Sequence, residues 1–379
     1  MLHGADELLP GETFWRDHSA WLKECGYELR RRFQPGWVPS WEGTKKDSYF
    51  CEDGLCFVRS DTYMDAKETS TGRIVAMKMI VHDESPDELA IGTFLSSGER
   101  SSDNRNHCVP ILRTLPIPDR EGQVIIVMPH LRAWYDPRFK TIGEGMQFFK
   151  QMLEGLQFLH ENHIAHCDGG FTNIMMDCSQ MYGPESFHPQ EQDMKYDFSA
   201  RARHSSRTEH PPKYYFIDFG LSIHYKPDEL PATICAVLGA DKSVPEFLAD
   251  KSQQTPKHDP FAVDVYYLGN AFRAFLRRGI AANYKIREKM LRGMRGFEFM
   301  EPLIVAMTEP DPVKRIKVDE AVKRLADIEK GLSAMTLRSR VVYNAEFTIL
   351  RPFKAVSHWV WTLGLVAQGI PATPKLSPQ

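Results

Sequence analysis

The hydrophobic pattern of this sequence changes once along the chain. Between Gly72 and Leu131, short runs rich in Val and Ile are bounded by turn residues, which is typical of strands in a small sheet. From Met146 to Leu159, apolar residues recur every three or four positions, which predicts an amphipathic helix ending near His163. A chain of 379 residues has room for two lobes. We therefore expect an α+β, bilobal fold with a small β-rich N-lobe and a larger helical C-lobe.

The composition argues against a collagenous, disordered or membrane-embedded protein. The hydrophobic content of 42%, the charged content of 26% and the net charge of −3 are ordinary for a globular protein, and nucleic-acid binding is not expected without a basic excess. The seven cysteines include no Cys-x-x-Cys pair, which argues against a zinc site and favours reduced thiols. The first residues lack the pattern of a signal peptide, so we expect an intracellular location, cytoplasmic or nuclear.

Changes in composition suggest the domain boundaries. We expect an N-terminal extension over 1–45, the N-lobe over 46–131, the C-lobe over 132–331 and a C-terminal tail over 332–379. The extension is rich in Trp and Arg and is expected to pack on the core rather than to bind a partner. A polar segment over 178–212, called the insert below, is expected to be a long, partly disordered surface loop.

Two features outside these lobes leave alternatives open. The basic end of the insert carries two serines, and a solvated loop is favoured there over a phosphorylation site or partner patch. This set comprises Arg201, Arg203, Ser205, Ser206 and Arg207. The apolar run from Trp359 to Ile370 is shorter than the roughly 20 residues needed to span a bilayer. A packing or amphipathic helix is favoured there over membrane contact.

The first chemical signal is His166-Cys167-Asp168, followed five residues later by Asn173. An aspartate in such a loop can accept or orient the proton of an attacking hydroxyl, and the asparagine amide oxygen can bind Mg²⁺. Alone, the same residues also fit a turn whose side chains bind backbone groups.

The second signal is Asp218, which follows an apolar strand and precedes Phe219 and Gly220. A carboxylate at a strand end, next to a residue that lets the backbone turn, can chelate Mg²⁺ on nucleotide phosphates. Alone, the triplet Asp218-Phe219-Gly220 is common and uninformative. Its position downstream of His166-Cys167-Asp168 is what supports a metal-binding role.

The third signal lies in the strand around Lys78. Alternation places Ala76 and Lys78 on the same face, which leaves room for an adenine ring beside a cation that reaches the phosphates. The next segment opens with Ser-Pro and acidic residues, as helices often do, and its Glu88 can fix the orientation of Lys78. Glu84 is a weaker candidate for that role, and an exposed capping carboxylate is the alternative for Glu88.

In this order, the three signals resemble a eukaryotic protein kinase, most closely the kinase-like proteins of mushroom-forming fungi, over roughly Asp61 to Leu325. The resemblance implies that Asp168 is the catalytic aspartate, that Asn173 and Asp218 bind Mg²⁺, and that Lys78 and Glu88 form the pair that holds the ATP phosphates. It also implies a hinge for the adenine ring, with Met128 as gatekeeper and backbone groups of Pro129 and Leu131 facing the base.

Further downstream, the resemblance extends to residues with structural roles. Val244-Pro245-Glu246 is similar to the Ala-Pro-Glu that closes a kinase activation segment, and Arg315 to the arginine that pairs with that glutamate. Asp264 resembles the aspartate that braces the catalytic loop. Small-molecule kinases generally lack the Pro-Glu, Asp264 and Arg315 set. Its presence counts against another possible function, that of a small-molecule phosphotransferase.

The sequence also departs from the kinase pattern. No glycine precedes Gly72 in the segment that should cover the phosphates, Cys167 replaces an arginine, and Gly170 stands where serine/threonine kinases have a lysine. Losing one positioned transition-state donor typically costs on the order of 10²–10³ in turnover. We expect a slow, ATP- and Mg²⁺-dependent kinase acting on protein hydroxyls, of serine/threonine type, with a nucleotide-binding or scaffolding pseudokinase as the alternative.

Overall fold

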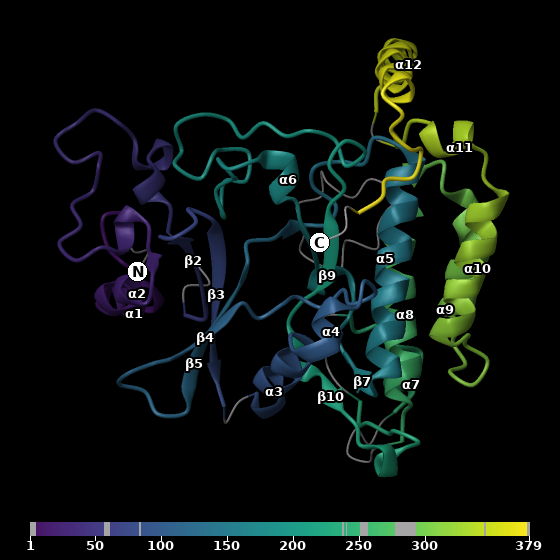
Figure 1. Ribbon diagram of the computed structural model, residues 1–379, viewed down its shortest axis with the longest axis horizontal. Coiled ribbons are helices and arrows are strands. Elements are labelled where there is room, and N and C mark those ends of the chain that lie inside the picture. The colour runs from purple at the N-terminus through teal and green to yellow at the C-terminus, as the bar shows by residue number, and fades with distance from the viewer. Residues whose placement is uncertain are drawn as a thin grey trace. The chain divides into compact units, whose positions relative to one another are not determined.

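The computed structural model describes residues 5–56, 61–82, 85–236, 239, 241–250, 257–276, 293–344 and 346–376 (Figure 1). Contacts divide the chain into two compact units. The first comprises Met1–Pro86, Pro110–Leu131 and Ser179–Ser205. The second comprises Asp87–Val109, Arg132–Cys178 and Ser206–Gln379.

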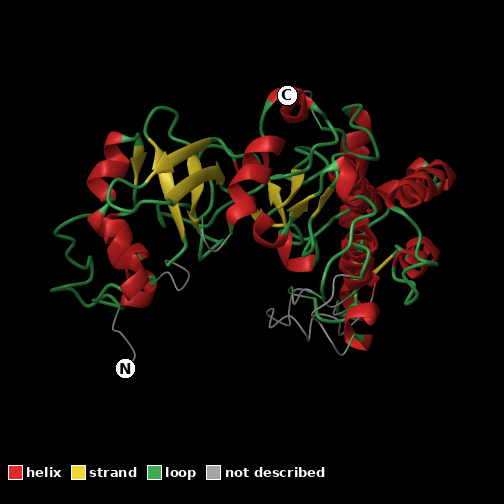
Figure 2. Ribbon diagram, turned by 90° about the horizontal axis from the view of Figure 1, so that it is seen from below, coloured by secondary structure: helices red, strands yellow, loops and turns green. Residues whose placement is uncertain are grey.

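The first unit is built on an antiparallel five-stranded sheet in the order β1-β2-β3-β5-β4 (Figure 2). Its strands are β1 (Tyr27–Glu28), β2 (Tyr63–Glu68), β3 (Ile74–Val81), β4 (Arg113–Pro116) and β5 (Gln123–Pro129). Its helices are α1 (Pro10–Asp17), α2 (Ser19–Glu24) and α6 (Ser179–Tyr182). The Val- and Ile-rich runs of the sequence thus form β3, β4 and β5, as predicted.

The N-terminal extension packs on this sheet and supplies its edge strand, β1. Trp15, Leu22 and Phe33 are fully buried in one apolar cluster with the sheet residues Val75 and Val127. The expectation that this segment packs on the core is confirmed, because burial of large apolar side chains is the main stabilising contribution available to it.

Residues 179–205 of the insert belong to the first unit, and apart from α6 they form a loop that is partly anchored on it. Within it, α6 is followed by a chain in which Phe187 and His188 are buried. The hydroxyl of Tyr196 donates to Asp65 on β2 over 2.8 Å. Asp65 also accepts from Arg30 of the extension, at 2.9 Å. Buried polar groups need partners, and these long-range pairs provide them.

The basic end of the insert is solvated in part: Arg201 and Arg203 are exposed, whereas its last two residues, at the start of the second unit, are not. Ser206 and Arg207 are buried. The hydroxyl of Ser206 donates to Glu209 over 2.6 Å, and Arg207 donates to the hydroxyl of Tyr214. A buried serine bound in this way is not presented to a modifying enzyme.

The second unit is mainly helical. Its helices are α3 (Pro86–Leu95), α4 (Gly98–Ser102), α5 (Ile142–Glu161), α7 (Pro245–Ala249), α8 (Pro260–Leu276), α9 (Glu301–Met307), α10 (Val318–Gly331), α11 (Ala334–Arg338) and α12 (Arg351–Ala367). Its strands are β6 (Arg132–Ala133), β7 (Ile164–Ala165), β8 (Ile174–Asp177), β9 (Lys213–Phe216), β10 (Ile223–His224), β11 (Met294–Arg295) and β12 (Val342–Tyr343).

The central helix of the second unit is α5, which begins with a capping box. Thr141 accepts from the backbone N–H of Glu144 over 3.1 Å, and the Glu144 carboxylate accepts from the N–H of Thr141. Met146, Phe149 and Leu153 are all buried, as the periodicity predicted. This rigid helix precedes β7 and the loop that carries Asp168.

No helix among the described residues is long and apolar enough to cross a membrane.

Candidate functional site

Asp168 lies in the loop between β7 and β8, within the second unit. The amide nitrogen of Asn173 donates to the Asp168 carboxylate over 2.7 Å and to the Asp168 carbonyl over 3.0 Å. The N–H of Gly170 donates to the same carbonyl over 2.8 Å. The loop therefore folds back on itself, and Asn173 fixes the orientation of the carboxylate.

Asp264 holds the start of this loop from outside. It lies on α8, is 1% exposed, and accepts the backbone N–H of His166 over 2.7 Å and that of Cys167 over 2.8 Å. Hydrogen bonds from buried amides to a carboxylate are strong and directional. The prediction that Asp264 braces the loop is confirmed.

Asp218 is positioned next to the same loop. The N–H of Ile217 donates to the Asn173 carbonyl over 3.0 Å, and the hydroxyl of Ser222 donates to the His166 carbonyl over 3.0 Å. These bonds bring the segments that carry Asp168, Asn173 and Asp218 side by side.

Two residues of this region have a left-handed backbone. Cys167 has φ +62°, and Asp218 has φ +63°. Non-glycine residues in this conformation cost of order 1–3 kcal/mol each and cluster at functional sites, where neighbouring contacts hold them. Cys167 directly precedes Asp168, and Asp218 carries its own carboxylate. Both aspartates have a predicted chemical role.

Cys167 offers neither charge nor nucleophile. It is fully buried, and burial together with the nearby Asp264 and Asp168 carboxylates raises the pKa of its thiol well above its usual range. It is therefore a neutral packing residue at the position where kinases carry an arginine.

The oxygen donors of this site suit Mg²⁺. Because the Asn173 amide nitrogen is engaged with Asp168, its amide oxygen is the atom left for a metal, and Asp218 adds a carboxylate. Magnesium commonly takes only one or two protein ligands and completes its shell with water and substrate phosphates. Among the described residues there is no cluster of three or more His, Cys, Asp or Glu side chains able to hold a metal.

The segment after Asp218 is anchored by a buried ion pair. Arg315 donates to both oxygens of Glu246, at 2.8 and 2.9 Å, and its side chain is fully buried. Arg315 also donates to the carbonyls of Ala262 and Glu309. The pairing expected from the resemblance is confirmed, and its fork geometry fixes α7 against α8 and the loop before α10.

Sequence reasoning missed two residues next to Asp168. A Cβ placed on Gly239 would lie 2.5 Å from the Asp168 carboxylate, so only glycine lets the backbone approach it there. Tyr267 on α8 is fully buried, and burial with the charges of Asp168, Asp241 and Asp264 raises the pKa of its hydroxyl. Neither residue had a signal in the sequence, because each is far from Asp168 along the chain and is brought near it only by folding.

The predicted nucleotide residues of the first unit lie on adjacent strands. Ala76 and Lys78 are on β3, Met128 and Pro129 are on β5, and Ala76 is paired with Met128 in the antiparallel register. The ammonium of Lys78 lies 5.7 Å from the ring centroid of Tyr63 on β2, and its side chain is half-buried. The sheet thus brings Ala76, Lys78 and Met128 together. Leu131 follows β5 and is buried.

Glu88 lies in the first turn of α3, in the second unit, and is buried. The expected helix start at Pro86 is confirmed, whereas the pairing of Glu88 with Lys78 stays a prediction. Glu84 and residues 57–60 of the predicted phosphate-covering segment lie outside the described residues.

No family model matches this chain. One curated relative, NUAK family SNF1-like kinase 2 from Rattus norvegicus, is 30% identical over 128 residues. That match covers 31% of this chain and 20% of the relative, so the chain spans about a fifth of the relative's length. The match supports a distant, kinase-like relationship over this part of the chain.

Proposed function

We propose that this protein is an ATP- and Mg²⁺-dependent protein kinase of serine/threonine type. In this proposal Asp168 orients the attacking hydroxyl of a protein substrate. Asn173 and Asp218 hold Mg²⁺, which neutralises charge on the nucleotide phosphates when bound. Lys78, positioned by Glu88, contacts the phosphates, while Ala76, Met128, Pro129 and Leu131 receive the adenine ring.

The observation that carries the proposal is the bond from Asn173 to Asp168 in a loop braced by Asp264. A turn that merely satisfied its own backbone would not need a buried carboxylate from α8 to hold two of its amides. Positioning of this kind is what phosphoryl transfer requires of a protein, because little covalent chemistry is left for side chains to do.

The same site favours slow turnover and leaves a pseudokinase as the second candidate. Cys167 is neutral and buried, and Gly170 has no side chain with which to contact a transferring phosphate. A nucleotide-binding or scaffolding module would retain Lys78 and Asp218 while transferring little phosphate.

Two measurements on the same preparation separate these functions. An active kinase incorporates phosphate from γ-labelled ATP into itself or into generic protein substrates, and Asp168→Ala abolishes this. A pseudokinase shows a thermal shift with ATP and Mg²⁺ but equal background labelling for both proteins. At 100 times Kd, bound nucleotide stabilises a protein by about 2.7 kcal/mol. The absence of both labelling and shift would refute both functions.

Two finer points belong to this proposal. An intracellular location, cytoplasmic or nuclear, is supported by the seven cysteines, all of which are free thiols. Kinship with the kinase-like proteins of mushroom-forming fungi rests on the sequence resemblance alone.

A further inference from the structure

The helix α12 turns its apolar side chains away from the protein. Residues 353, 356, 360 and 363 of α12 follow one another at spacings of three, four and three, which places them on one face, and Ile349 lies in the 3-10 helix Thr348–Leu350 that leads into α12. We call this set the apolar stripe: Ile349, Phe353, Val356, Val360 and Leu363, which are 83%, 73%, 67%, 66% and 65% exposed. The residues that α12 buries are His358, Thr362 and Leu365, two of which are polar.

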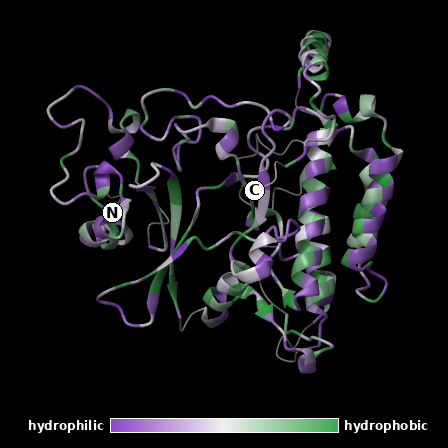
Figure 3. Ribbon diagram, in the orientation of Figure 1, coloured by the Kyte–Doolittle hydropathy of each residue, from purple (hydrophilic) through white to green (hydrophobic). Residues whose placement is uncertain are grey.

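This orientation is the reverse of an ordinary surface helix. Packing against the core normally uses the apolar face, and an exposed patch of this kind marks an interaction site. In Figure 1, α12 extends past the ends of α5 and α10, and Figure 3 shows hydrophobic residues along it. Within the run Trp359–Ile370 only Thr362 and Leu365 are buried, so of the two expected forms, a packing or an amphipathic helix, the second describes it better.

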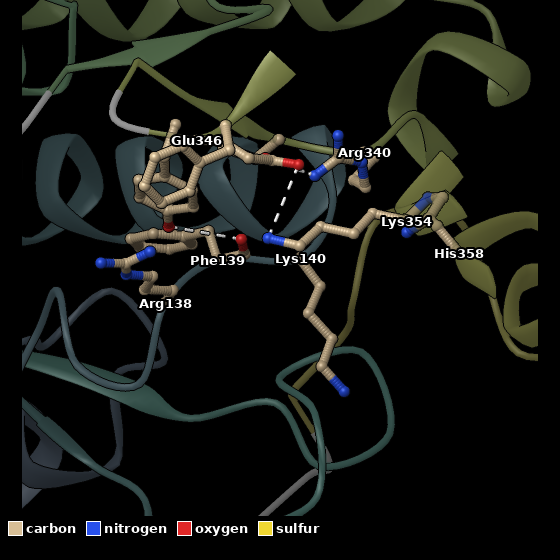
Figure 4. A pocket seen from close by; sticks show the side chains of 10 residues that line it. Arg138, Phe139, Lys140, Arg340, Glu346, Lys354 and His358 are labelled. Atoms are coloured by element: carbon tan, nitrogen blue, oxygen red, sulfur yellow. Dashed lines mark hydrogen bonds and ion pairs between the residues drawn. The ribbon is translucent and has the colours of Figure 1, made fainter. Parts of the chain in front are cut away.

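The side of α12 opposite the stripe contributes one cation, Lys354, beside the buried His358, whose pKa is lowered by burial. Lys354 and His358 line an open depression of about 500 Å³ together with Arg138, Lys140 and Arg340 (Figure 4). Its one carboxylate, Glu346, pairs with Arg340 at 2.8 Å and with Lys354 at 3.6 Å. Four permanent cations therefore face one anion.

The remaining cations of the depression lie beside aromatic rings, and Lys140 also interacts electrostatically with the Glu209 carboxylate. The guanidinium of Arg138 is 4.8 Å from the ring centroid of Tyr343, and the ammonium of Lys140 is 4.9 Å from that of Trp361 on α12. The charge of Arg138 thus remains available to an anionic partner, and that of Lys140 remains so in part.

The charge bias continues along the chain. No Asp or Glu occurs after Glu346, whereas Arg351, Lys354 and Lys375 do, although the whole chain has a net charge of −3. An amphipathic helix with an exposed apolar stripe, whose charged residues, Arg351 and Lys354, are both basic, is suited to lie in the interface of an anionic membrane.

A second copy of the chain is a poorer partner for this face. Two stripes could pack together, but the pairing would bring two basic helices together with no carboxylate on α12 to compensate either one. Charge complementarity instead favours a lipid bilayer, whose interior is apolar and whose headgroup region is negative.

We propose that α12 binds peripherally to anionic lipid membranes, with the apolar stripe inserted among the acyl chains and the cations of the depression directed to the headgroup phosphates. The helix has 17 residues and lies along the surface instead of crossing it. This binding is independent of the proposed kinase chemistry.

The test is co-sedimentation of the full chain with vesicles of phosphatidylcholine alone or mixed with phosphatidylserine. We expect binding to the mixed vesicles, weakened by salt, and little binding to phosphatidylcholine. Val360→Asp should weaken binding about tenfold or more, because it places a charge in the inserted face. Lys140→Gln should weaken it about fivefold, as expected for one cation near the surface.

Matched controls are Val313→Asp, at a side chain 92% exposed outside α12, and Lys330→Gln, in an exposed pair on α10. Both should bind like the wild type. Equal binding to the two vesicle types, or full binding by Val360→Asp, would overturn the proposal. So would displacement of wild type from vesicles by millimolar inorganic phosphate, or a dimer in light scattering that Val360→Asp dissociates.

Discussion

Replacing Asp264 tests whether the loop that carries Asp168 depends on a distant brace. In Asp264→Asn the amide oxygen can still accept one backbone N–H, but its nitrogen now faces the other, at a site where the aspartate oxygens lie 2.7 and 2.8 Å from the nitrogens of His166 and Cys167. One buried amide loses its partner, which costs about 1–3 kcal/mol. Asp264→Ala removes both acceptors and should cost about twice as much.

Urea titration followed by tryptophan fluorescence measures this loss as a lower midpoint at unchanged slope. Hydrogen exchange should accelerate at the amides of His166 and Cys167, and phosphate transfer should fall because Asp168 is displaced. Asp228→Asn, at an exposed aspartate of the same unit, should stay within about 0.5 kcal/mol of wild type. If Asp264→Asn has the urea midpoint and the rate of phosphate transfer of the wild type, the bracing role is refuted.

Three further changes probe other parts of the structure. Arg315→Met leaves the buried Glu246 charge unpaired and should lower the free energy of unfolding by about 3–5 kcal/mol in urea titrations. Gly239→Ala should reduce kcat about 10²-fold with little change in the urea midpoint, because its Cβ would displace the Asp168 carboxylate. Burial would raise the pKa of Asp65, but the charge and hydrogen bonds of Arg30 outweigh it and lower that pKa. The stability Asp65 contributes is therefore complete above about pH 4 and is lost as the pH falls through its folded value, so Asp65→Asn should be less stable at neutral pH and lose less on acidification.

Each of these changes has a matched control. Arg324→Met breaks an exposed i,i+4 pair with Glu320 and should cost at most about 0.5 kcal/mol. Gly331→Ala adds a Cβ in open space and should leave kcat unchanged. Asp6→Asn, at an exposed aspartate, should not alter the acid limb of the stability curve. A control that behaves like its test variant contradicts the corresponding argument.

Local patterns predicted the parts of the fold that depend on neighbours in sequence. The buried face of α5 follows from a three- and four-residue period, and β3 and β5 follow from short Val- and Ile-rich runs bounded by turns. Two pairs join distant segments: Asp264 with the loop that carries Asp168, and Glu246 with Arg315. The kinase resemblance predicted both, and periodicity predicted neither.

The polar composition of the insert predicted a surface loop but gave no sign of the contacts that anchor it. Its ordering depends on partners far away in sequence: Tyr196 binds Asp65, and His188 lies within 3.4 Å of Glu52. Burial of polar side chains is favourable only when such partners exist, and a local pattern does not reveal them. Gly239 was not predicted for a related reason: its role depends on the nearby Asp168 carboxylate, and a glycine adds no side chain to a hydrophobic or polar pattern.

The central claim is that Asp168 promotes transfer of phosphate from ATP to a protein hydroxyl. The most direct measurement is incorporation from γ-labelled ATP into serine- and threonine-containing substrates with Mg²⁺ or with a chelator, for wild type and Asp168→Asn. We expect slow, Mg²⁺-dependent labelling on serine or threonine that falls by about 10²–10³ in the variant. Equal labelling by the two proteins, or labelling that persists without Mg²⁺, would contradict this claim.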